Sequence, residues 1–91
     1  MESIHLKISG RVQGVGFRWF VTEKARRLGL SGWVKNRADG NVEVAAAGDP
    51  AALELLEAAV AAGPPGAEVK HVERLPAVEP NSLGSPFAIA R

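Results

Sequence analysis

The sequence has no cysteine and no tyrosine, and aromatic side chains make up only 5% of its residues. Without cysteine the chain has no disulfide, no thiolate metal ligand and no cysteine nucleophile. No apolar run approaches the ~20 residues that a membrane-spanning helix needs. The start of the chain, Met1 to His5, lacks the basic residues and the apolar stretch of a signal peptide. These absences predict a soluble, cytoplasmic protein.

The length and the composition fit one globular domain. A domain usually has roughly 100–150 residues, so a chain of 91 residues has no room for a second core. Its 46% hydrophobic and 23% charged residues are typical of a globular protein and unlike a disordered one. We expect residues 1–91 to form a single domain.

Charge is distributed unevenly, although the formal net charge is only +1. Residues 11–37 carry seven Lys and Arg side chains against one acid, Glu23, whereas the rest of the chain carries four basic residues against nine acidic ones. A local excess of positive charge favours an anionic partner. A basic helix face exposed to water gives the same pattern, so charge alone leaves both interpretations open.

Apolar patterning and turn signals predict the order of the secondary structure. They predict strands over residues 4–8, 30–35, 42–46, 69–74 and 87–90. A helical period begins at Phe17 and stops at Gly29, and a second helix begins after Asp49 and ends at Gly63.

The order strand-helix-strand-strand-helix-strand, followed by a short extra C-terminal strand, is typical of an α+β protein. The hairpin in the middle favours an antiparallel sheet with two helices on one face, which is the ferredoxin-like βαββαβ sandwich. This architecture carries many functions, among them RNA binding, ligand sensing, metal transport and small enzymes. Function therefore has to be argued from individual residues.

The segment between the first strand and the first helix contains Gly10, Gly14 and Gly16. Glycine lets the backbone turn tightly and bring its N–H groups close to a ligand, and a helix N-terminus binds anions readily. Arg18 follows in the first helical turn, where the helix dipole disfavours a cation by up to ~1 kcal/mol unless an anion lies beside it. The pattern predicts a phosphate-binding loop, with a flexible turn and a surface arginine as the alternative.

The two common nucleotide-binding patterns do not fit this loop. The pattern G-x-G-x-x-G needs a glycine where Trp19 stands, and the Walker pattern needs a Gly-Lys-Ser or Gly-Lys-Thr end that is absent. The sequence predicts an anion loop rather than a nucleotide loop.

Asn36 stands at the end of the second predicted strand, just before the turn at Asp39 and Gly40. An asparagine beside a turn is most often a turn former. Its amide also donates and accepts hydrogen bonds, so that it can hold a water molecule in place. Taken alone, Asn36 leaves both roles open.

Two stretches of the sequence resemble the signatures of the acylphosphatase family. Residues 8–18, from Ile8 to Arg18, are similar to the first signature, and residues 32–42, closed by Gly48, are similar to the second. Both stretches have the family's order and separation, and the resemblance spans nearly the whole chain.

The resemblance implies hydrolysis of carboxyl–phosphate anhydrides to a carboxylate and inorganic phosphate, with no metal and no cofactor. The family's phosphate loop falls on Gln13, Gly14, Val15, Gly16, Phe17 and Arg18. Arg18 matches its catalytic arginine, which binds the phosphate, and Asn36 matches its catalytic asparagine, which positions the attacking water. Inorganic phosphate is then expected as a product and as an inhibitor. At Arg37 relatives often carry a small hydroxyl residue, so the hydrogen bonding that orients Asn36 stays open.

Three rival functions remain. A nucleic-acid-binding module shares the order of elements but needs aromatic side chains on adjacent central strands, and the first strand has none. The two other rivals are a domain of this form that acts on one specific anhydride, such as carbamoyl phosphate, and one that binds a ligand without turnover. We expect an acyl phosphate as the partner, with no nucleic acid, no membrane and a monomeric chain.

The remaining histidines and tryptophans are expected to be structural. His5 and His71 lie on predicted strands far from the loop, and no His, Asp and Glu cluster has the spacing of metal ligands. Trp19 and Trp33 are expected to pack within the protein rather than to stack on a ligand.

Overall fold

The computed structural model describes residues 1–90 as a five-stranded sheet with two long helices. The elements are β1 (Glu2–Arg11), α1 (Phe17–Arg27), β2 (Ser31–Asn36), β3 (Val42–Gly48), α2 (Pro50–Ala62), β4 (Glu68–Arg74), the 3₁₀ turn η1 (Pro80–Ser82) and β5 (Ala88–Ile89). This order confirms the predicted ferredoxin-like βαββαβ fold with an extra C-terminal strand. Among these residues, neither helix has the length and apolar character needed to cross a membrane.

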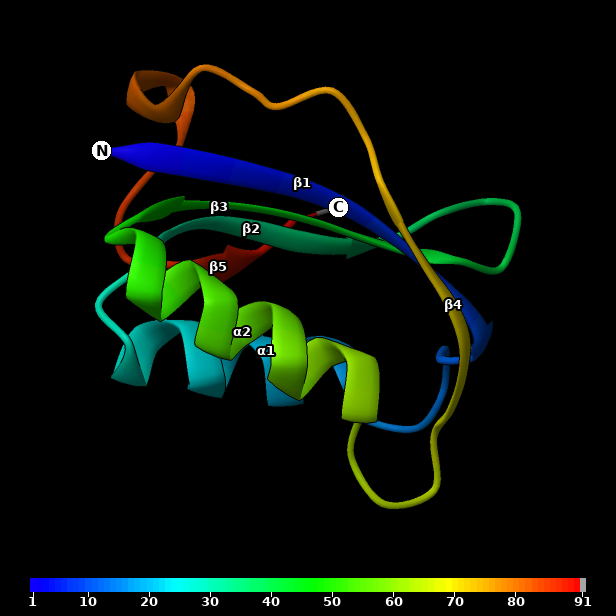
Figure 1. The fold of residues 1–91 in the computed structure, drawn as a ribbon. Coiled ribbons are helices and arrows are strands. Elements are labelled where there is room, and N and C mark those ends of the chain that lie inside the picture. Colours follow the sequence, from blue (N-terminus) through cyan, green and yellow to red (C-terminus); the bar gives the residue numbers. More distant parts are fainter. Residues whose placement is uncertain (91) are drawn as a thin grey trace.

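The strands lie in the order β4-β1-β3-β2-β5, and both helices cover the same face of the sheet (Figure 1). The first four pair antiparallel, as predicted, but β5 pairs parallel to β2, so the sheet is mixed. The reason is the long connection after β4. It passes β1, where Ser3 Oγ donates to the Val78 carbonyl, and reaches β2, where the Gly32 N–H donates to the Gly84 carbonyl. A connection of this length carries the chain from β4 at one edge of the sheet to the opposite edge, where β5 runs in the same direction as β2.

The core lies between the helices and the sheet and follows from the alternation in β1. Ile4, Leu6 and Ile8 are buried against the helices, while the residues between them face the other side of the sheet. The helices contribute apolar stripes with a helical period, namely Phe17, Val21 and Ala25 from α1 and Leu53, Leu56 and Val60 from α2. Burial of these stripes fixes α1, and with it the loop that precedes α1, against the sheet.

The direction of the strands brings parts of the two predicted signatures to the same end of the sheet. Both β1 and β2 run antiparallel to β3, so they run in the same direction and finish at the same end of the sheet. Val42 of β3 pairs with Ile8 on one side and with Asn36 on the other. Asn36 therefore lies level with the last part of β1. The loop that leads into α1 begins where β1 ends.

Candidate active site

Two glycines shape the loop between β1 and α1. Gly14 has a φ of 75° and Gly16 a φ of 76°, a left-handed conformation that other residues adopt at a cost in free energy. A Cβ atom at either position would meet no atom within 4 Å. Glycine is therefore required here by the backbone conformation and not by crowding, and the space in front of the loop is open.

The loop and the start of α1 present backbone N–H groups that have no protein acceptor. The first helical bond into the loop runs from the Phe20 N–H to the Gly16 carbonyl, at 3.0 Å. Gly16 occupies the N-cap position without a side chain to accept a bond. Within residues 1–90, no N–H group from residue 14 to residue 19 donates a hydrogen bond. These groups and the helix dipole create a positive potential in front of the loop.

Arg18 adds a full charge to this potential. Its side chain is exposed in the first turn of α1, and that turn contains no acidic residue. None of the ion pairs within residues 1–90 involves Arg18. A guanidinium and several N–H donors thus face the same space without a counter-charge from the described part of the chain, an arrangement that favours a bound anion.

A small cavity of about 140 Å³ brings most of the predicted site together. Its lining residues are Val12, Gly14, Gly16, Phe17, Arg18, Trp19, Asn36 and Ile89. Of the residues that the sequence places in the phosphate site, Gln13 and Val15 are not part of this lining.

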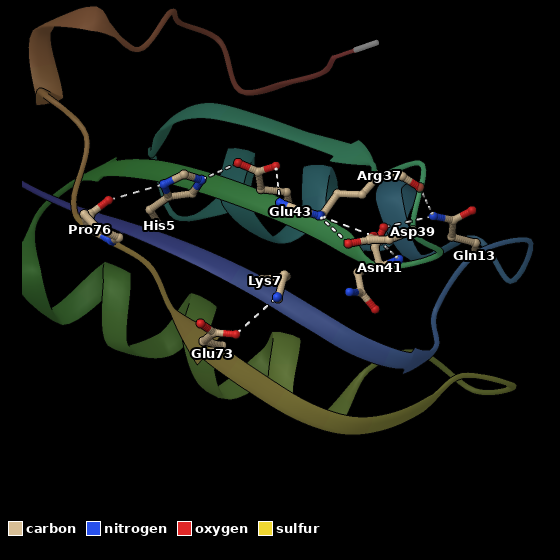
Figure 2. A network of polar contacts seen from close by, with 9 residues as sticks. All are labelled: His5, Lys7, Gln13, Arg37, Asp39, Asn41, Glu43, Glu73 and Pro76. Atoms are coloured by element: carbon tan, nitrogen blue, oxygen red, sulfur yellow. Dashed lines mark hydrogen bonds and ion pairs between the residues drawn. The ribbon is translucent and has the colours of Figure 1, made fainter.

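The Gln13 side chain points to the β2–β3 hairpin instead. Its Nε2 donates to the backbone carbonyls of Arg37 and Asn41, at 2.9 Å each (Figure 2). The amide thereby connects the glycine loop to the turn of the hairpin, which follows Asn36 directly. Sequence reasoning missed this role, because the partners lie 24 and 28 residues away and no local pattern links them.

Asn36 lines the cavity and carries a buried amide oxygen. Its Oδ1 is the one buried side-chain oxygen or nitrogen within residues 1–90 that has no hydrogen-bond partner. An unsatisfied buried acceptor costs about 1–3 kcal/mol, and a donor that comes within hydrogen-bond distance of it removes this cost. Such a donor can be a water molecule, and this feature distinguishes Asn36 from an ordinary turn former.

Arg37, the departure from the family pattern, does not bond to the Asn36 side chain. Its guanidinium pairs with Asp39 at 3.1 Å and with Glu43 at 3.2 Å. The hydrogen bond to Asp39 raises the pKa of Arg37. The Asn41 N–H and the Arg37 guanidinium in turn lower the pKa of Asp39. Both groups are charged at neutral pH, and the hydrogen bonding left open at Asn36 is not supplied by Arg37.

A larger, open hollow of about 450 Å³ lies beside this hairpin, lined by residues 35–39 and Glu43. Three of the charges on its walls pair with one another, because Arg37 contacts both Asp39 and Glu43. The smaller cavity, by contrast, is lined by Arg18 and by the loop whose N–H groups have no acceptor among the described residues. We therefore assign the candidate site to the smaller cavity.

Neither histidine reaches this cavity. His5 Nε2 lies 2.5 Å from a Glu43 carboxylate oxygen, and its Nδ1 lies 3.3 Å from the Pro76 carbonyl (Figure 2). His71 is exposed on β4. Across residues 1–90, no group of three His, Asp or Glu side chains is arranged to hold a metal ion.

The two tryptophans differ from one another. The prediction that Trp19 packs within the protein is wrong, because its side chain is 65% exposed at the rim of the cavity. It follows Phe17 by two positions on α1, and this places it off the buried stripe. Trp33 does pack, edge-on against the His5 ring with 5.8 Å between the ring centroids.

Comparison with known proteins shows the family to which the chain belongs. The family model described as Acylphosphatase matches residues 4–89. An acylphosphatase of Thermococcus kodakarensis is 54% identical over 69 residues, 76% of each chain, and one of Rhodospirillum rubrum is 44% identical over 84 residues, 92% of each chain. The crystal structure of acylphosphatase from Bacillus subtilis matches with a TM-score of 0.92 over the whole of both chains, at 38% identity. The chain therefore belongs to the acylphosphatase family, whose reaction is the hydrolysis of acyl phosphates.

Proposed function

We propose that this chain hydrolyses acyl phosphates by binding the phosphoryl group between the glycine loop and Arg18 and by positioning the attacking water with Asn36. One observation carries the proposal. Asn36, whose buried Oδ1 has no partner within residues 1–90, lines the same cavity of about 140 Å³ as Arg18 and the loop whose N–H groups have no acceptor among those residues.

Phosphate binding follows from the charge of the cavity. The N–H groups of residues 14–18 and the positive end of α1 meet the non-bridging oxygens of the phosphoryl group. The Arg18 guanidinium donates hydrogen bonds to two of these oxygens, because the spacing of its N–H groups matches that of the oxygens. Negative charge on these oxygens is stabilised in the transition state by donors that need no reorganisation.

The reaction then needs a correctly placed water. Its oxygen forms a bond to phosphorus while the bond from phosphorus to the carboxyl oxygen breaks, and that electron pair leaves with the carboxylate. One water proton is held by Asn36 Oδ1, and the other passes to a phosphoryl oxygen. The products are the free carboxylate and inorganic phosphate. The carboxylate is a good leaving group, so positioning and charge neutralisation suffice without a metal ion or a strong base.

Gln13 belongs to this scheme as a positioning residue. Its two bonds of 2.9 Å join the phosphate loop to the hairpin after Asn36. The phosphorus atom is held by the loop and the water by Asn36, so the bonds of Gln13 set the distance between the two reactants. A misplacement of 1 Å can cost about 10² in rate.

For Arg18→Ala we expect kcat/KM for benzoyl phosphate, measured with a chelator present, to fall by ~10²–10³, the usual cost of losing a charge-stabilising donor. The kcat/KM of Arg18→Lys should be close to that of Arg18→Ala, because an ammonium group cannot form two parallel hydrogen bonds. Arg27→Ala, which removes an exposed arginine of the same helix, is the matched control and should change kcat/KM less than twofold. A loss below tenfold in folded Arg18→Ala contradicts the role of Arg18.

For Asn36→Ala we expect kcat to fall by ~10², while inhibition by inorganic phosphate keeps its constant, since the loop and Arg18 remain. The free energy of unfolding should not decrease, because the substitution removes a buried oxygen without a partner. Denaturant unfolding measures this second quantity. Asn81→Ala, at an exposed asparagine of η1, serves as the control. Weaker phosphate inhibition together with the loss of kcat would assign Asn36 to phosphate binding instead.

For Gln13→Met, which keeps the length of the side chain and removes its donor, we expect kcat to fall about tenfold. If Gln13 acts by positioning the loop relative to Asn36, the same substitution in the Asn36→Ala background should lower kcat by less than twofold. Kinetics of the two single variants and the double variant provide this test. Full additivity of the two losses would mean that Gln13 acts independently of Asn36.

A further inference from the structure

Large apolar side chains are exposed at four positions within residues 1–90. Met1 is 82% exposed, Trp19 65%, Leu55 60% and Ile89 43%. Single exposed apolar residues are common on protein surfaces and need no explanation. Trp19 and Ile89 differ from the other two because both line the cavity that contains Arg18 and Asn36.

The fold holds both side chains on elements that also carry the site. Trp19 follows Arg18 directly in the first turn of α1. Ile89 lies in β5 and pairs with Val34 of β2, two residues before Asn36. The Ala90 N–H donates to the Val34 carbonyl at 2.8 Å and fixes β5 at this edge. The two apolar side chains therefore keep their places relative to the phosphate loop and to Asn36.

The size of the cavity shows which part of a substrate these side chains meet. Pockets that enclose a whole ligand have volumes of about 300–1,000 Å³, whereas this cavity has about 140 Å³. The polar donors of the loop and Arg18 account for the phosphoryl group. The remainder of the substrate has to extend past the rim, where Trp19 and Ile89 are exposed.

We propose that Trp19 and Ile89 form a binding site for the acyl group and that this site selects apolar, above all aromatic, acyl phosphates over small ones. This inference rests on the proposed function and adds the substrate class. An aromatic ring gains contact with the Trp19 indole and with the branched Ile89 side chain, and aromatic pairs gain free energy beyond the area they bury. An acetyl group offers only a methyl group for these contacts.

The test compares kcat/KM for benzoyl phosphate and acetyl phosphate in the wild type, Trp19→Ala, Trp19→Phe, Ile89→Ala and Leu55→Ala, with folding checked by circular dichroism. The ratio of the two values in each variant, relative to the wild type, cancels the different reactivity of the two anhydrides. We expect the ratio to fall about tenfold in Trp19→Ala and by a smaller factor in Ile89→Ala. Trp19→Phe should keep most of the wild-type ratio.

Leu55→Ala is the matched control, because Leu55 is as exposed as Trp19 but lies on α2 outside the cavity. Its ratio should equal that of the wild type. If the wild type hydrolyses both substrates and the ratio is unchanged in Trp19→Ala and Ile89→Ala, the acyl site is wrong and the proposed function stands. If the folded wild type hydrolyses neither substrate, the proposed function fails and the acyl site fails with it.

Discussion

The N-terminus of α1 concentrates positive charge that the described part of the chain does not neutralise. Its N-cap is a glycine without a side-chain acceptor, its first turn has no acid, and Arg18 stands where the helix dipole is already positive. This arrangement disfavours the folded chain alone and favours a complex with an anion. The other features of the site, from the left-handed glycines to the apolar rim, surround this one charged position.

The sheet supplies a second feature, a fixed position of the Asn36 amide relative to the glycine loop. Because β1 and β2 run in the same direction, the loop after β1 and Asn36 at the end of β2 meet at one end of the sheet. Gln13 then ties the loop to the hairpin through two backbone carbonyls. In the proposed function, the loop binds the charge, Asn36 at the end of β2 places the water, and Trp19 and Ile89 at the rim recognise the acyl group.

Much of the fold could be predicted from the sequence because it depends on local patterns. The alternation in β1 and the helical stripes of α1 and α2 predict those elements within a few residues. The parallel pairing of β5 could not be predicted, since it depends on the path of the long connection after β4.

Some features of the site could likewise be predicted from local patterns, whereas others depend on contacts between distant parts of the sequence. The glycines and Arg18 form a local pattern that indicates an anion site. The sequence without the resemblance leaves open whether Asn36 forms a turn or holds a water, because only the pairing of Val42 with both Ile8 and Asn36 brings it level with the last part of β1. The role of the Gln13 side chain depends on contacts distant in sequence, and the exposure of Trp19 depends on which face of α1 packs on the sheet. Local composition carries no signal for the contacts of Gln13, whereas the helical period that begins at Phe17 does place Trp19 off the buried stripe.

The most direct measurement is a titration of the ¹⁵N-labelled protein with inorganic phosphate, followed through the backbone amide chemical shifts. If phosphate binds where the free N–H groups converge, the amides of residues 14–18 should show the largest saturable shifts, and these should disappear in Arg18→Ala. Saturable shifts centred on the basic C-terminal turn of α1, at Arg26 and Arg27, or no saturable shift at all, would contradict the phosphate loop.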